Sequence, residues 1–199
     1  MIKMPNNWNE VKEFSERTKL PLGAYVCKVK QCRVQDNDYG SQLAILFDIH
    51  EGEYKGYYAN DFDSQQDQNK KWKGVLRIWL PKEDGSDKDE FTKSILKGTV
   101  TAFENSNLGY TWNWNEKTLE GKLIGILFRN EEWEYDGKSG WAVRPFRAIS
   151  ASSVREGSFT LPKDKPLTNK SGASSAPSYL PPSDTNGFVE VDLDDQLPF

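Results

Sequence analysis

The segment DKDEFTKSILKGTVTAFEN, residues 87–105, decides the fold, because no other long stretch of the sequence has the spacing of an amphipathic helix. The side chains at helical intervals are apolar or small, namely Phe91, Ile95, Leu96, Thr99, Val100 and Phe103. Ser86 or Asp87 would cap the start of this helix, whereas Gly98 weakens its centre. The sequence therefore predicts one long helix, and the segments on either side determine what it packs against.

Three predicted strands precede this helix. Residues 23–34 are rich in β-branched side chains, and residues 43–49 alternate apolar and other side chains, which is typical of a strand with one buried face. Residues 75–80 alternate in the same way until Pro81 ends the strand. Residues 51–62 are expected to begin as a turn and to continue as extended chain.

A predicted hairpin follows the helix. Residues 122–135 form a long strand, Asp136 and Gly137 form a hairpin turn, and residues 140–149 return as the last strand. Three strands, a helix and a hairpin are the arrangement of the OB-fold, although other small barrels and α+β sheets fit the same order. We therefore expect a mainly β protein, a five-stranded OB-fold-like barrel with one helix between strands 3 and 4. A short helix over residues 7–17 is also plausible.

The composition indicates a folded core. Aromatic residues make up 13% of the 199 residues, although the apolar share of 36% is low. No stretch reaches the roughly 18 apolar residues of a membrane span, and the N-terminus lacks the apolar run of a secretory signal. We therefore expect no membrane contact and a cytoplasmic location.

Neither a metal site nor an enzyme is predicted. Cys27 and Cys32 are five residues apart in one expected strand, so we expect them on opposite faces and reduced. His50 is the single histidine, and a zinc site needs about four ligands, so we expect no metal and no cofactor. The triplet EYK at residues 53–55 has the spacing of metal-dependent nucleases, but no acidic partner with the right strand context accompanies it.

The composition changes near residue 160, beyond which lie six of the ten prolines and a net charge of −3 out of the total of −4. We assign residues 1–19 to an N-terminal extension, 20–160 to a folded domain, 161–187 to a disordered linker and 188–199, FVEVDLDDQLPF, to an acidic tip. The apolar residues at the end of this tip add nothing to solubility. The tip is therefore predicted to be a peptide ligand on a tether, and a solubilising tail is the alternative.

The sequence DLDDQLPF resembles the acidic tip of single-stranded DNA-binding proteins, which is a run of Asp followed by Ile-Pro-Phe. The matching residues are Asp192, Asp194, Asp195, Pro198 and Phe199, whereas Leu197 replaces Ile and Gln196 interrupts the acidic run. In that family the tip docks on replication, recombination and repair enzymes. The resemblance therefore implies such enzymes as partners of these tip residues.

The body is similar to phage-encoded single-stranded DNA-binding proteins of Gram-positive hosts. The similar segments are EGEYKGYY (51–58), KKWKGV (70–75), SNLGYTWNW (106–114) and GKLIGILFRNEEWEYDGK (121–138). The resemblance implies an OB-fold domain that binds and protects single-stranded DNA without sequence preference during phage replication and recombination, in the cytoplasm of the host cell. Many relatives assemble into multimers, so a homo-oligomer stays open.

Single-stranded DNA is held by bases that stack on aromatic side chains and by Lys and Arg near the phosphates. Arg77 and Trp79 share the face of the third strand opposite its apolar residues, and a basic cluster around Trp72 precedes that strand. The candidate DNA-binding residues are Lys28, Lys30, Tyr57, Tyr58, Phe62, Lys71, Trp72, Lys73, Arg77, Trp79, Trp133, Tyr135 and Trp141. Because the body is nearly neutral, we expect stacking to dominate and the salt dependence to be shallow.

Each of these candidates has a structural alternative. Trp79 would instead be core under the helix, and Lys28 and Lys30 would protect a sheet edge. The three glutamates of the hairpin would repel phosphates, and Trp112 and Trp114 are expected to cap the core. Two other functions also fit the sequence. One is a protein-interaction adaptor of the replication machinery with no direct DNA binding, and the other is a sugar-binding β-domain.

Overall fold

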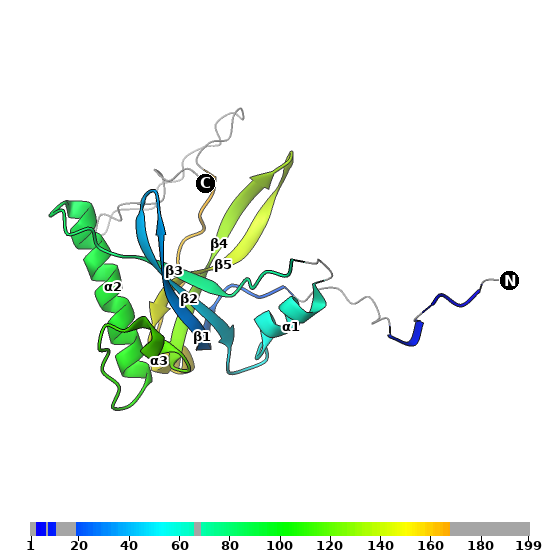
Figure 1. The fold of residues 1–199 in the computed structure, drawn as a ribbon, viewed down its shortest axis with the longest axis horizontal. Coiled ribbons are helices and arrows are strands. Elements are labelled where there is room, and N and C mark those ends of the chain that lie inside the picture. The colour runs from blue at the N-terminus through cyan, green and yellow to red at the C-terminus, as the bar shows by residue number, and fades with distance from the viewer. Residues whose placement is uncertain (1–2, 7, 11–18, 66–68, 168–199) are drawn as a thin grey trace, which may run out of the picture.

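The computed structural model describes residues 3–6, 8–10, 19–65 and 69–167, which form a mixed α/β fold around an open, antiparallel, five-stranded sheet (Figure 1). The strands are β1 (Ala24–Asn37), β2 (Gly40–Ile49), β3 (Val75–Trp79), β4 (Leu123–Tyr135) and β5 (Lys138–Ile149). The helices are α1 (Tyr57–Ser64), α2 (Asp87–Ser106) and α3 (Ala151–Glu156), with 3-10 turns at Trp8–Glu10 and Glu116–Leu119. The strand order is β3-β2-β1-β4-β5, so β3 and β5 form the two edges.

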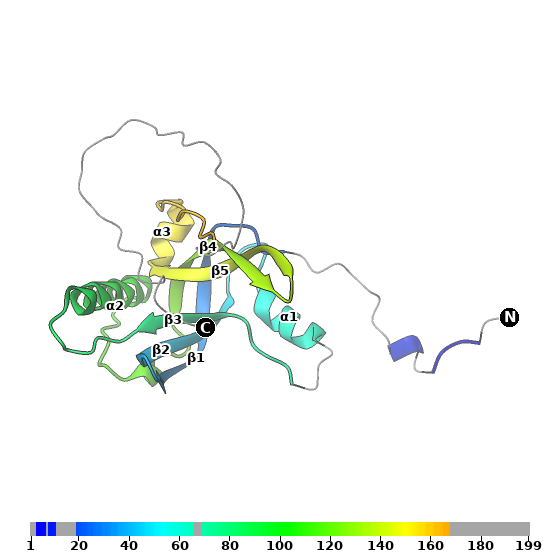
Figure 2. The same cartoon turned by 90° about the horizontal axis from the view of Figure 1, so that it is seen from above.

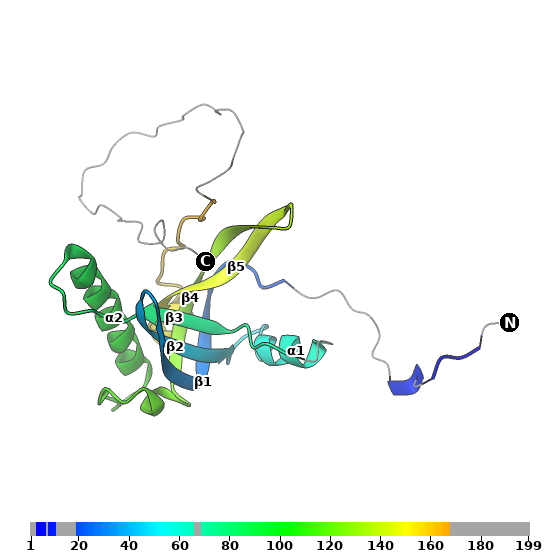
Figure 3. The ribbon, with the colours of Figure 1, turned by 45° about the horizontal axis from the view of Figure 1, so that its top comes forward.

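The helices cover different parts of this sheet. Figure 1, Figure 2 and Figure 3 all show α1 and α2 on opposite sides of it. The β4–β5 hairpin extends beyond the rest of the sheet in Figure 1 and Figure 3. Within the described ranges, no helix is long and apolar enough to cross a membrane.

The predicted long helix is confirmed as α2. The hydroxyl of Ser86 accepts a hydrogen bond from the main-chain N–H of Asp89 at 3.2 Å, which caps the helix as the sequence indicates. Its apolar face is buried at Leu96 and Phe103, among others. At the other end, the amide of Asn107 donates to the carbonyl oxygens of Phe103 and Leu123 at 2.8 Å each. This side chain joins the end of α2 to the start of β4.

The predicted strand patterns are also confirmed. The alternating residues of β2 are all buried, at 0–2% exposure, and they are Leu43, Ile45, Phe47 and Ile49. The rings of Phe47 and Phe128 lie 6.2 Å apart edge to face, which links β2 to β4 across the core. The hairpin turn at Asp136 and Gly137 joins β4 to β5 with positive φ at both residues.

A β-bulge in β1 changes the direction of its side chains. Val29 pairs with Phe47 and Gln31 pairs with Leu46, so Lys30 is an extra residue with no partner in β2. As a result Cys27 and Cys32 are both buried on the core side, and the expectation of opposite faces is wrong. Both thiols are free, as expected. Their partners in β2, Ile49 and Ile45, are four residues apart, so the two cysteines are separated along the sheet by roughly 13 Å, at about 3.3 Å per residue.

Residues 57–64 form the helix α1 and not the extended chain expected over residues 51–62. Gly56 precedes the helix with φ 76°, and as a glycine it has no side chain to cap the helix. The carboxylate of the buried Asp48 on β2 takes this role, because it accepts the main-chain N–H groups of Tyr58 at 2.9 Å and Ala59 at 3.2 Å. A cap supplied from another element leaves no local sequence signal.

The chain beyond residue 160 continues along β4. The main chain of Lys165 donates to Asn130 at 2.8 Å and accepts from Glu132 at 2.9 Å, which covers a free edge of β4. Main-chain pairing therefore extends past the expected boundary of the domain. The expected helix over residues 7–17 falls largely outside the described residues, and so does the tip, including Asp192, Asp194, Asp195, Leu197, Pro198 and Phe199.

Candidate nucleic-acid interface

The outer face of β1, β2 and β3 is crossed by three rows of side chains. Directly paired residues of an antiparallel sheet project from the same side. The rows are Gln31–Leu46–Val75, Arg33–Ala44–Arg77 and Gln35–Gln42–Trp79. Arg77 and Trp79 therefore share this face, opposite the buried Leu76 and Ile78, as the sequence pattern predicts. Trp79 is half-buried.

The middle row combines two arginines with a small residue. Arg33 and Arg77 are exposed and flank Ala44, which is 1% exposed beneath them. Neither guanidinium group forms an ion pair within the described part of the chain. Such groups are suited to bidentate contact with phosphate. Arg33 was missed from the sequence, because plain alternation along β1 from Lys28 places it on the core side.

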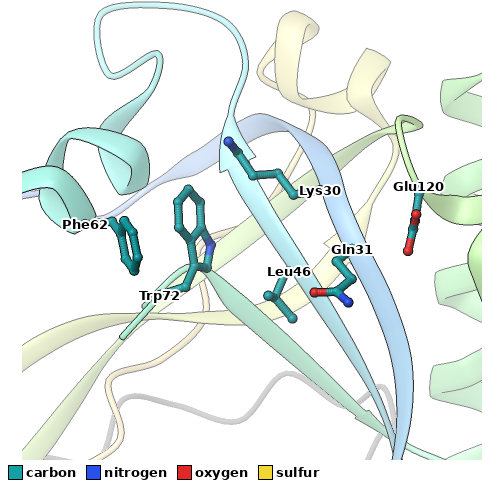
Figure 4. Close-up of a pocket in the computed structure, with 6 residues that line it drawn as sticks. All are labelled: Lys30, Gln31, Leu46, Phe62, Trp72 and Glu120. Carbon is teal, nitrogen blue, oxygen red and sulfur yellow. The ribbon is translucent and has the colours of Figure 1, made fainter. Parts of the chain in front are cut away.

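At one end of this face lies an open groove of about 450 Å³ (Figure 4). Its lining residues are Lys30, Gln31, Leu46, Phe62, Trp72 and Glu120. The rings of Phe62 and Trp72 have centroids 5.8 Å apart and are tilted by 46°. Lysine ammonium groups lie near both rings, with Lys30 Nζ 4.8 Å from the Trp72 centroid and Lys70 Nζ 5.7 Å from that of Phe62. The groove therefore places aromatic faces beside positive charge.

Trp72 is held in this position by its own ring nitrogen. Its indole N–H donates to the main-chain oxygens of Phe47 at 3.0 Å and Gly74 at 3.2 Å. The Trp72 side chain is half-buried. A tryptophan fixed by hydrogen bonds at its edge keeps its ring face in a constant orientation, which suits stacking.

The segment before β3 is fixed to α1 by the buried side chain of Gln65. The amide oxygen of Gln65 accepts from Lys71 N–H at 2.8 Å, and its nitrogen donates to Lys71 O at 2.9 Å. The same nitrogen donates to Asp61 at 3.0 Å, and Asp61 forms an ion pair with Lys73 at 3.0 Å. The charge of Lys73 is therefore partly neutralised by Asp61. The side chain of Lys71 is exposed to solvent, while its main chain is held by Gln65.

The three aromatic candidates of α1 have different surroundings. Phe62 lines the groove, and Tyr57 is half-buried. Tyr58 is only 6% exposed, and its ring packs edge to face on Phe47 at 5.4 Å. Burial raises the pKa of its hydroxyl far above the ordinary value. Tyr58 thus belongs to the core and offers no face to a base, in contrast to the expectation from the sequence.

The lysines of β1 lie on its exposed side. Lys28 and Lys30 are both exposed, and Lys30 projects from the bulge into the groove. Because β1 is the central strand, the alternative that these residues protect a sheet edge is wrong. Both are available to a polyanion beside the aromatic pair.

The β4–β5 hairpin has two different faces. Trp133 pairs with Gly140 and Tyr135 pairs with Lys138, which puts the two aromatic rings on one face. Trp141 pairs with Glu132 and therefore lies on the other face. Trp133 packs closely over Gly140, since a Cβ atom there would lie 3.1 Å from the indole. Tyr135 is 80% exposed.

The charges of the hairpin follow the same division. On the Trp133 face, Glu131 forms ion pairs with Arg129 at 2.9 Å and Arg144 at 3.7 Å, so its charge is offset. Glu132 and Glu134 point to the opposite face, with Trp141. The three glutamates are therefore divided between the two faces of the hairpin, with one on the Trp133 face and two on the Trp141 face.

Of the two tryptophans expected to cap the core, only Trp114 differs from the expectation. Trp112 packs partly on the core, but Trp114 is 72% exposed. The ring centroids of Trp112 and Trp114 lie 4.9 Å apart. Trp114 has φ 66°, in the left-handed region, which turns it away from the core side of the chain. Its exposure makes it a convenient control for the interface tryptophans.

Among the described residues, no three His, Cys, Asp or Glu side chains are grouped so as to hold a metal ion. Comparison with known protein families gives no match, and comparison with curated proteins gives none either.

Proposed function

We propose that this protein binds single-stranded DNA, without overall sequence preference, on the outer face of β1–β3, in the adjoining groove and along the β4–β5 hairpin. The observation that carries this proposal is that ring faces lie beside cations that form no ion pair within the described part of the chain. Trp72 and Phe62 line the groove, and Arg33 and Arg77 form the next row of the same face, two residues beyond Gln31 and Val75. Stacked bases contribute roughly 1–3 kcal/mol each, so two or three ring faces give substantial affinity.

We further propose that the sheet belongs to an OB-type barrel. The helix α2 lies between β3 and β4 in the chain, and β1 pairs with both β2 and β4. The edge strands β3 and β5 also contact each other, which is what closure requires. In OB-folds the strands 2 and 3 and the flanking loops bind nucleic acids, and the groove borders the corresponding strands here.

The tip supports the second half of the proposed role. Residues 192–199 resemble the partner-binding tip of single-stranded DNA-binding proteins, and the body resembles the phage-encoded members. On this proposal the domain protects single strands during phage replication and recombination, and the tip recruits replication, recombination or repair enzymes. No catalytic step is part of this role.

Intrinsic tryptophan fluorescence during titration with oligo-dT tests DNA binding, with duplex of the same length as the control. We expect quenching by the single strand only, with saturation at a defined number of nucleotides per chain. Trp72→Ala should lower the affinity about tenfold or more, given roughly 1–3 kcal/mol for one stacked base. Trp114→Ala is the matched control, because it removes an exposed indole outside the groove.

The adaptor function predicts the opposite result. A protein that uses this surface for another protein would bind neither DNA, and its fluorescence would not change. Absence of binding would therefore overturn the proposal and leave the adaptor role in its place. Equal binding to single strand and duplex would also overturn the proposal, and it would contradict the adaptor role as well.

A further inference from the structure

The groove beside Trp72 has a polar end as well as an aromatic one. Figure 4 shows the side chains of Gln31 and Glu120 at the end away from Phe62 and Trp72, with Leu46 between the two groups. Aromatic rings, an apolar floor and polar groups at one side are the features of a pocket for a planar, hydrogen-bonding ring. A nucleobase of a bound single strand has this chemistry.

Glu120 is held in place and still has acceptor capacity. One carboxylate oxygen accepts the main-chain N–H of Cys32 at 3.3 Å. No ion pair to Glu120 occurs within the described ranges, so its negative charge is not offset by a neighbouring cation. A fixed, uncompensated carboxylate repels a phosphate and accepts hydrogen bonds from N–H groups.

Gln31 reaches the same groove because of the bulge in β1. It directly follows the extra residue Lys30, and both side chains are exposed. Its amide has no hydrogen-bond partner among the described residues. An amide donates and accepts, so Gln31 is able to meet the ring nitrogen or carbonyl of a base whose amino group points to Glu120.

We infer that this groove selects a nucleobase with an exocyclic amino group, and that Glu120 is the residue that accepts from it. Cytosine, adenine and guanine have such a group, whereas thymine and uracil carry in its place a carbonyl oxygen that a carboxylate repels and keep only the ring N3–H as a donor. The inference rests on the proposed function, since it concerns a base of the bound single strand. It adds a preference at one position of an otherwise sequence-tolerant surface.

Competition between oligodeoxycytidine and oligodeoxyuridine of equal length is the sharpest test. The two bases have the same ring size and differ at the N3 and C4 positions, where cytosine carries the amino group. We expect the full chain to bind the cytidine oligomer about tenfold more tightly, as measured by fluorescence anisotropy of a labelled strand. Glu120→Gln should reduce this ratio to about one, because the amide of Gln also pairs with the carbonyl of uracil.

Glu116→Gln is the matched control, because Glu116 begins the 3-10 turn that Glu120 directly follows but does not line the groove. It removes the same charge, so it should raise both affinities equally and keep the ratio. Equal affinity of the full chain for the two oligomers would overturn the inference and leave the proposed function intact. Loss of the preference in Glu116→Gln as well would also overturn it. Binding of neither oligomer would overturn the proposed function itself.

Discussion

The side chain of Arg33 lies on the outer face of the sheet because β1 contains one extra residue, Lys30. The bulge at Lys30 reverses the alternation, so Arg33 pairs with Ala44 and stands across from Arg77. Two guanidinium groups on either side of a small residue leave space for one phosphate between them. The proposed phosphate contact of Arg33 therefore depends on a single irregularity in the strand pairing.

Arg33→Gln should weaken single-stranded DNA binding and flatten its salt dependence. Loss of one phosphate contact lowers the slope of log K against log salt by about 0.7 for a single strand. The measurement is the affinity for oligo-dT over a series of salt concentrations. Lys97→Gln, on the exposed side of α2, removes the same charge far from the rows and should leave the slope unchanged. An unchanged slope in Arg33→Gln would remove this residue from the interface.

The buried thiols should be unreactive in the folded protein. Burial, with smaller effects from Glu116 and Glu120, raises the pKa of Cys32 to about 12, and burial also raises that of Cys27. At pH 8 iodoacetamide should label neither thiol until urea unfolds the chain, as measured by mass spectrometry. The raised pKa also favours folding below about pH 9, and this contribution declines as the pH rises toward 12. Labelling of the native protein at the unfolded rate would contradict the burial of both residues.

At the scale of elements, two glycines have opposite roles. Gly98 lies inside α2 with nothing within 4 Å of a Cβ atom, so its lack of a side chain only weakens the helix. Gly74 precedes β3, where a Cβ atom would lie 2.5 Å from Phe47 O and 2.7 Å from the ring of Tyr58. The close approach at Gly74 helps to seat the Trp72 segment on β2.

Gly98→Ala should raise the free energy of unfolding by about 1 kcal/mol. Gly74→Ala should lower it by about 1–3 kcal/mol, because the new methyl group overlaps backbone and ring atoms. Urea unfolding followed by circular dichroism measures both changes. The opposite signs are the test, since a substitution that acted only on the unfolded chain would stabilise at both positions.

The elements that the sequence predicts are those with local signals. The helix α2 follows from its apolar spacing and Ser86, and the hairpin follows from Asp136 and Gly137. The bulge of β1, the cap of α1 by Asp48 and the hydrogen bonds of Gln65 to Lys71 depend on contacts between different elements or loops. Local periodicity contains no trace of these contacts, and they set the positions of Arg33, Phe62 and Trp72. The fold is thus more predictable than the site.

At the scale of the whole molecule, the positive and negative charges lie in different regions of the chain and of the fold. The total of −4 includes −3 beyond residue 160, so the body is nearly neutral. Within it, the exposed Arg33 and Arg77 lie on the outer face of β1–β3 and form no ion pair among the described residues. Glu132 and Glu134 lie on the opposite face of the hairpin from Trp133. A local cluster of positive charge is therefore able to attract a polyanion, although the net charge of the protein is negative.

The groove and the Trp133 face of the hairpin should bind the same DNA strand when that strand is long enough. A 5-mer of dT covers the groove alone, whereas a strand of about 15 nucleotides reaches both, within the usual range of OB-fold sites. Trp133→Ala should therefore weaken the longer oligomer about tenfold and leave the shorter one unchanged, whereas Trp72→Ala should weaken both. Isothermal titration calorimetry with the two lengths measures this difference.

Two further variants serve as controls, one for the folding of the hairpin and one for the face to which the DNA binds. Trp133→Phe keeps a ring over Gly140 and should retain most of the affinity, so a loss in Trp133→Ala reflects stacking and not unfolding of the hairpin. Trp141→Ala removes an indole from the face of Glu132 and should change neither affinity. If Trp141→Ala is the damaging substitution, the strand runs along the acidic face. The division of the hairpin into two faces would then not direct the strand to Trp133, and the proposed path of the DNA along that face would be wrong.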